Sequence, residues 1–143
     1  MTIANLKTPI LLSLLTIVSA QAQSGTDSEE RILPIVDASN LITRASSCHA
    51  LGRELNLDTH IHFPDLTESI FKSLDNAGWS SQDVAEALTW SQEALPEIPS
   101  NSEESQHQYL TRLYDSKFRC NDIDRAYSEK VAASIPENPE IMK

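Results

Sequence analysis

Glycine, and the short motifs that depend on it, are scarce in this chain. Only Gly25, Gly52 and Gly78 occur, and none of them belongs to a GxGxxG or P-loop pattern. The chain also lacks a Gly-x-Ser-x-Gly elbow and a CxxC pair. Because no catalytic signature is present, we expect a protein that is not an enzyme and that needs no cofactor.

Positive charge is scarce as well. The chain has 11 Lys and Arg against 21 Asp and Glu, which gives a formal net charge of −10. Binding to nucleic acid or to anionic lipid depends on cationic side chains, so this composition disfavours both partners. It favours either a merely solvated surface or a basic protein partner.

No apolar run is long enough to cross a bilayer. Ile10–Val18 is about half as long as the ~20 residues that a transmembrane helix needs. Lys7 precedes this run, and Ala20-Gln21-Ala22 follows it with the small-x-small pattern of a signal-peptidase site. We therefore expect residues 1–22 to be a cleaved signal peptide and the protein to be exported, either periplasmic or secreted. Lys7 is the only charged side chain of that segment, so the mature chain carries a charge of −11.

Only two cysteines are present, Cys48 and Cys120. In an oxidising compartment a lone pair of cysteines usually forms a disulfide. Closing so long a loop stabilises a chain by about 4 kcal/mol in the chain-entropy model. We therefore expect a Cys48–Cys120 bond. His49 beside Cys48 suggests a thiol and its base, but a disulfide would remove the nucleophile.

No stretch alternates polar and apolar residues with the period of a strand, so we expect an all-α fold. The first of four helical segments runs from about Pro34 to Leu55, with Cys48 on its inward face. The expected architecture is a small helical bundle or orthogonal array of four to five helices. One disulfide would join its first and last helices.

The mature chain divides into three parts by composition. We expect a disordered leader over 23–31, a single helical domain over 32–135 and a flexible tail over 136–143. No Asn-x-Ser/Thr acceptor occurs, which fits a protein of the bacterial envelope.

A helix hairpin is predicted at Gly78-Trp79-Ser80. Gly78 suits the left-handed residue after a helix, and Trp79 would then pair with Leu74 in a Schellman ending. Ser80 suits the N-cap of the next helix, where Trp79 and Val84 would form a hydrophobic staple.

Two further capping boxes are predicted from sequence spacing. Asp65 with Glu68 would begin the second helix, and Asn101 with Glu104 would begin the fourth. The fourth helix is either continuous or broken at Asn121-Asp122.

His60 and His62 are the sharpest candidates for chemistry. In an extended segment both imidazoles lie on one side, and Asp58 or Asp65 could complete a metal site. The alternative is an ordinary polar loop that is packed by Ile61 and Phe63.

Three acidic doublets and an aromatic run complete the candidates. Paired carboxylates suit glycoside chemistry, the start of a helix or contact with a basic partner. The doublets are Glu29-Glu30, Glu103-Glu104 and Asp122/Asp124. The aromatic run suits a core, with a partner-facing tyrosine as the alternative. It consists of Tyr109, Tyr114, Phe118 and Tyr127.

The order of these features resembles uncharacterised small secreted two-cysteine helical proteins of alphaproteobacteria. The shared layout is a signal, an early cysteine (Cys48), a Gly-aromatic-Ser hairpin (78–80) and a late cysteine (Cys120), and it covers roughly Leu41–Arg125. This resemblance implies no activity. In architecture alone the chain is also similar to helical periplasmic immunity proteins that neutralise wall-degrading toxins, without a shared residue motif.

Three functions follow from these patterns. The first is a non-catalytic exported binding protein, such as an inhibitor or immunity protein for a cationic wall-degrading enzyme. The second is an envelope structural or acid-stress protein, since acidification would neutralise its many carboxylates. The third is a metal-binding protein that uses His60 and His62.

Overall fold

The computed structural model describes residues 29–59 and 61–142. Contacts divide the chain into two units, Met1–Leu33 and Pro34–Lys143, and the account below concerns the second. In the first unit, residues 29–32 are helical, although we expected 29–31 to be the end of a disordered leader. The predicted signal peptide and residues 23–28 lie outside the described residues.

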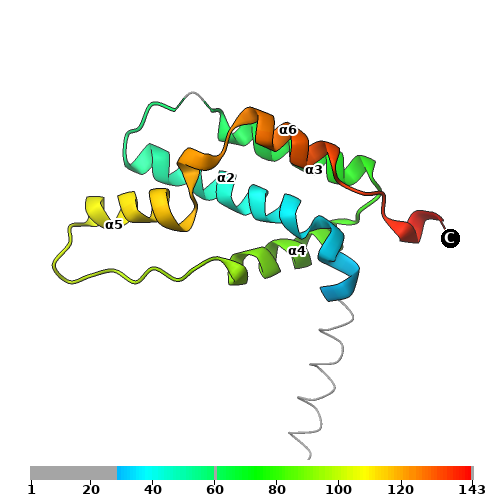
Figure 1. The fold of residues 1–143 in the computed structure, drawn as a ribbon, viewed down its shortest axis with the longest axis horizontal. Helices are drawn as coiled ribbons and strands as arrows, with labels where there is room; N and C mark the ends of the chain where they lie inside the picture. The colour runs from blue at the N-terminus through cyan, green and yellow to red at the C-terminus, as the bar shows by residue number, and fades with distance from the viewer. Residues whose placement is uncertain (1–28, 60, 143) are drawn as a thin grey trace, which may run out of the picture. The chain divides into compact units, whose positions relative to one another are not determined.

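The described residues form helices joined by turns and loops and contain no strand, which confirms the all-α fold. The elements, drawn in Figure 1, are η1 (Leu33–Ile35), α2 (Val36–Glu54), α3 (Phe63–Asn76), α4 (Ser81–Ala94), α5 (Gln106–Arg112), the π-helical η2 (Leu113–Lys117), η3 (Cys120–Asp122), α6 (Arg125–Ala133) and η4 (Pro139–Met142). Among these helices, none combines the length and the apolar character required to cross a membrane.

Helix α2 is the centre of the core. It contacts α3, α4, α6, η2 and η3, so that these elements pack around it (Figure 1). Leu41, Ile42, Ala45 and Cys48 recur at helical spacing and are almost completely buried. Each large aliphatic side chain buried in this way stabilises the fold by roughly 1.5–3 kcal/mol.

The helix hairpin predicted at residues 78–80 is confirmed. Gly78 has φ 85°, and its N–H donates to the Asp75 carbonyl at 2.9 Å. The Trp79 N–H donates to the Leu74 carbonyl at 3.1 Å, which completes the Schellman motif. The Ser80 hydroxyl then accepts from the Asp83 N–H at 3.1 Å and caps α4.

The predicted start of the second helix is wrong by two residues. Helix α3 begins at Phe63, after an extended His62, and Pro64 lies in its first turn. Proline is accepted there because the first N–H groups of a helix have no partner within it. Phe63 is buried, and its packing places the first residue of the helix before Asp65.

The predicted start of the fourth helix is also wrong. Asn101 and Glu104 close a separate turn, in which the Asn101 N–H donates to the Glu104 carboxylate at 2.8 Å. Helix α5 begins later, at a capping box made by Ser105 and Gln108. Ser105 rather than Asn101 is the N-cap of α5, because the Glu104 side chain is already bonded to Asn101 and Arg112.

The chain between α5 and α6 is broken, which decides between the two predicted alternatives. The Phe118 N–H bonds to the Leu113 carbonyl five residues earlier, and Arg119 adopts a left-handed φ of 49°. Helix α6 then begins with Asp124 as its N-cap, rather than Asp122.

The C-terminal residues contact the helix hairpin, whereas we expected a flexible tail. The Asn138 N–H donates to the Ala77 carbonyl at 2.8 Å, and its side-chain amide donates to the Gly78 carbonyl at 3.0 Å. The Trp79 indole N–H donates to the Pro136 carbonyl at 2.8 Å. These bonds satisfy carbonyls that the end of a helix leaves without partners, which explains why a proline-containing tail is held.

Candidate interaction surface

Of the two candidate histidines, the structure describes His62 alone. His60 lies outside the described residues. His62 directly precedes α3, and its Nδ1 lies 3.0 Å from the Asp65 carboxylate, with both side chains mostly exposed. Within residues 29–59 and 61–142, no group of three His, Cys, Asp or Glu is placed to hold a metal ion. Histidine with one carboxylate is an incomplete ligand set for zinc.

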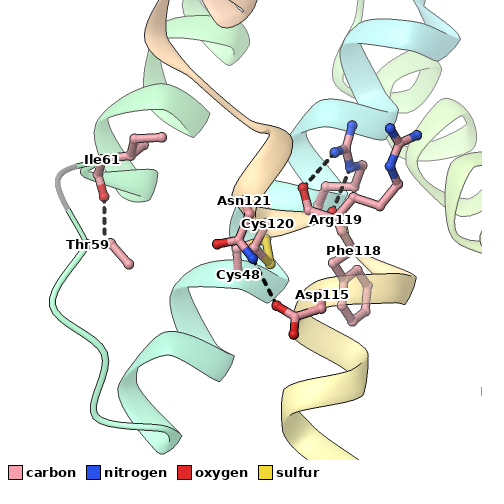
Figure 2. The surroundings of a disulfide bond; sticks show 9 residues. Cys48, Thr59, Ile61, Asp115, Phe118, Arg119, Cys120 and Asn121 are labelled. Carbon is pink, nitrogen blue, oxygen red and sulfur yellow. Dashed lines mark hydrogen bonds between the residues drawn. A yellow bond between two sulfur atoms is a disulfide. The ribbon is translucent and has the colours of Figure 1, made fainter.

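The Cys48–Cys120 disulfide is present and joins α2 to η3 (Figure 2). Both cysteines are buried, and neither is free. The thiol beside His49 is therefore already oxidised, and this pair has no nucleophile. His49 is partly buried.

Arg44 is a second link between α2 and the same turn. This side chain is only 9% exposed, and it donates from Nε to the Phe118 carbonyl at 2.8 Å and from Nη2 to the Arg119 carbonyl at 3.0 Å. Burial lowers the pKa of Arg44 from its usual value, although a guanidinium remains charged in proteins. The disulfide region is therefore a structural clamp and not a reactive site.

The acidic doublets are engaged within the protein to different extents. Asp122 pairs with Arg119 at 3.0 Å, and Asp124 caps α6. The hydrogen bond from Arg112, followed by that from the Asn101 N–H, lowers the pKa of Glu104. Glu103, by contrast, is exposed at the tip of a turn. Glu104, Asp122 and Asp124 therefore have partners within the protein, in turns and at the start of a helix.

Charge is segregated along the chain. The 39 residues from Ser73 to Thr111 contain seven carboxylates and neither Lys nor Arg. They comprise the end of α3, all of α4, the loop between α4 and α5, and the first part of α5. The exposed carboxylates among them are Asp75, Glu93, Glu97 and Glu103. We call α4 together with residues 95–105 the acidic arm.

The loop of the acidic arm is held in one conformation by α5. Residues 95–105 have no helix or strand and are longer than the median connection of about 4–6 residues. The Tyr109 hydroxyl donates to the Ile98 carbonyl at 2.9 Å, and Arg112 donates to the Pro99 carbonyl at 2.9 Å. Arg112 also bonds the Glu104 carboxylate from Nε at 2.9 Å. Binding residues are found disproportionately on surface loops that a rigid scaffold positions.

The aromatic run divides between core and surface. Tyr114 is buried, and its burial raises the pKa of its hydroxyl. Tyr109 and Phe118 are half-buried. Tyr127 is exposed, so the core interpretation of the aromatic run is wrong for this residue. The break before α6 rotates that helix relative to α5, and a continuous helical period cannot predict the rotation.

Comparison with known proteins gives no indication of function, so the fold and these surfaces are the basis for a proposal. No protein-family model, no curated protein and no solved structure matches this chain.

Proposed function

We propose that this chain is an exported, non-catalytic binding protein of the bacterial envelope that holds a basic protein through its acidic arm. The partner class that fits best is a cationic wall-degrading enzyme, for which the chain would be an inhibitor or immunity protein. The observation that carries the proposal is the segregation of charge between Ser73 and Thr111. A surface of one sign attracts a partner of the opposite sign and accelerates its encounter.

The order of the arm supports the same function. Binding a partner with a flexible loop costs conformational entropy, whereas a loop that is already fixed avoids most of that cost. Tyr109 and Arg112 fix this loop from α5 while leaving Glu93, Glu97 and Glu103 exposed. The arm is therefore preorganised for contact.

One observation favours the alternative of an acid-stress protein. Carboxylates hold both the turn at Glu104 and the first turn of α6 at Asp124. Acidification to pH ~3–4 and below would protonate Glu104, release its turn and expose apolar surface. An apolar dye that stays dark over that range with the mature protein would argue against this function.

The test of the proposed function compares two sets of neutralised carboxylates of equal charge. The arm variant replaces Glu93, Glu97 and Glu103 with Gln, and the control replaces Glu54→Gln, Asp58→Asn and Glu137→Gln, which are exposed elsewhere. We expect the arm variant to associate about tenfold more slowly with a basic muramidase at low salt, and the control to associate almost normally. Salt at about 0.5 M should remove the difference, because it screens exposed charges.

The refuting result is equally specific. If the oxidised mature protein neither binds nor inhibits any basic wall-degrading enzyme at low salt, the proposed function is wrong. If both variants slow association equally, the contact depends on net charge and not on the arm.

A further inference from the structure

Two neighbouring hollows lie beside α3, one toward α2 and one toward α4, and they share one aromatic side chain. The turn at 78–80 joins α3 to α4, and both helices pack on α2. One hollow, of about 460 Å³, lies between α2 and α3, and includes His49 and Pro64 in its lining. The other, of about 190 Å³, lies between α3 and α4 and includes Val84 and Leu88. Phe71 lines both.

Phe71 is not needed to fill the core of the protein. Helix α3 buries Phe63, Ile70 and Leu74 to 3%, 1% and 1% exposure, whereas Phe71 remains 40% exposed. Single exposed apolar residues are common and need no explanation. Phe71 differs because a hollow lies on each side of it, which is the arrangement of an aromatic anchor at a binding surface.

Carboxylates flank this ring on the same helix face. Glu68, Phe71 and Asp75 follow the spacing i, i+3 and i+7, so that one acid lies before the aromatic ring and one after it. Glu68 lines the first hollow and Asp75 lines the second, and neither lining includes Lys or Arg. Seven residues of a helix span about 10 Å, so the two carboxylates are separated by that distance along α3.

We propose that this groove, centred on Phe71, receives an amphipathic helix of the basic partner. An apolar side chain of that helix would contact Phe71, and two cations spaced by seven residues would pair with Glu68 and Asp75. The proposal rests on the proposed function, which supplies a basic partner, and it adds the place and the form of the anchoring contact. Ala85 and Leu88 connect the groove with the acidic arm because they belong to α4.

Other occupants fit this groove less well. A second copy of the chain would bring the Glu68 and Asp75 pairs of two molecules together, and each mature chain carries a charge of −11. The C-terminal tail is already bonded to Ala77 and Gly78 at the end of the hairpin. A cationic helix has the complementary charge.

The experiment uses the oxidised mature protein and two synthetic peptides of about 15 residues. The first peptide places Leu between Lys residues at i and i+7 on one helix face, and the second has the same composition in scrambled order. We expect the ordered peptide to bind at least about tenfold more tightly than the scrambled one. Phe71→Ala should weaken binding of the ordered peptide about tenfold. The double variant Glu68→Gln with Asp75→Asn should remove most of the salt dependence of that binding.

Two further variants separate loss of the groove from loss of the fold. Leu57→Ala removes an apolar side chain of similar exposure outside the groove, and it should leave binding unchanged. Ala85→Arg keeps a good helix former at an exposed position of α4 but fills the groove and adds a cation, so it should abolish binding. Circular dichroism of each variant confirms that the helices are intact.

The outcomes distinguish the two proposals. Equal binding of both peptides, or binding that Phe71→Ala and Ala85→Arg leave unchanged, would overturn the groove. The basic muramidase assay with the arm variant then still tests the proposed function by itself. If neither peptide binds and no basic enzyme partner is found, both the groove and the proposed function are overturned.

Discussion

Replacing Gly78 with alanine tests the helix hairpin and the docked tail in one experiment. Gly78 has φ +85°, a conformation that costs an alanine about 1–2 kcal/mol. Alanine also restricts the unfolded chain, which offsets about 0.4–1 kcal/mol of that cost. The backbone alone therefore predicts a loss of about 1 kcal/mol in the free energy of unfolding.

The tail adds a second contribution. A Cβ at position 78 would lie 2.8 Å from the Cδ1 of Ile141, which is closer than carbon atoms can approach. Ile141 is 58% exposed, so its side chain can move away, but it then loses its contact with the hairpin. That loss is worth about 0.5–1 kcal/mol, and Gly78→Ala should cost about 2 kcal/mol in total.

The assay is urea unfolding of the oxidised chain, followed by circular dichroism and tryptophan fluorescence. In an Ile141→Ala background the Cδ1, Cγ1 and Cγ2 atoms are gone, so Gly78→Ala should cost only about 1 kcal/mol. Gly52→Ala is the matched control, because Gly52 is helical and its nearest neighbour would lie 3.9 Å from the added Cβ. That variant should be stabilised by about 0.5–1 kcal/mol. An equal cost of Gly78→Ala in both backgrounds would refute the tail contact, and no cost in either would refute the left-handed turn.

Three other predictions concern the clamp and the acidic arm. Reducing the disulfide, which spans a sequence separation of 72, should lower the free energy of unfolding by about 4 kcal/mol, and an unchanged urea midpoint would contradict this. Arg44→Met removes the donors to the two carbonyls before Cys120 and should cost about 2–3 kcal/mol in the same assay, unlike an exposed Arg53→Met control. The hydrogen bond from Arg112 lowers the pKa of Glu104, so its contribution to stability is present above the unfolded-state pKa and is lost as pH falls through the lower folded value. Amide shifts of the turn should follow this titration in NMR spectra, and Glu104→Gln should abolish it.

The features that the sequence predicted correctly have local determinants. The turn at 78–80 depends on one glycine, one capping serine and the tryptophan between them, all within three residues. The disulfide followed from the presence of only two cysteines. The start predicted at Asp65 was wrong because the buried Phe63 lies before this cap, and the start predicted at Asn101 was wrong because Ser105 is a second good cap.

The contacts that the sequence did not predict join distant residues. Arg44 bonds carbonyls 74 and 75 residues away, and Asn138 bonds a carbonyl 60 residues away. No periodicity encodes such pairs. The groove at Phe71 was missed because helical spacing places this residue at the edge of the buried face and reveals nothing about hollows beside it. The signal that could have found it is the spacing of Glu68, Phe71 and Asp75.

The position of the disulfide has a consequence for survival among proteases. Helices α3, α4 and α5 all lie between Cys48 and Cys120, and so does the exposed loop of the acidic arm. A single cut anywhere in that loop would leave the two pieces covalently attached, with α3 and α4 still packed on α2. A nicked molecule would therefore migrate as one species until it is reduced, whereas the same proteolysis would separate an unlinked chain into two fragments.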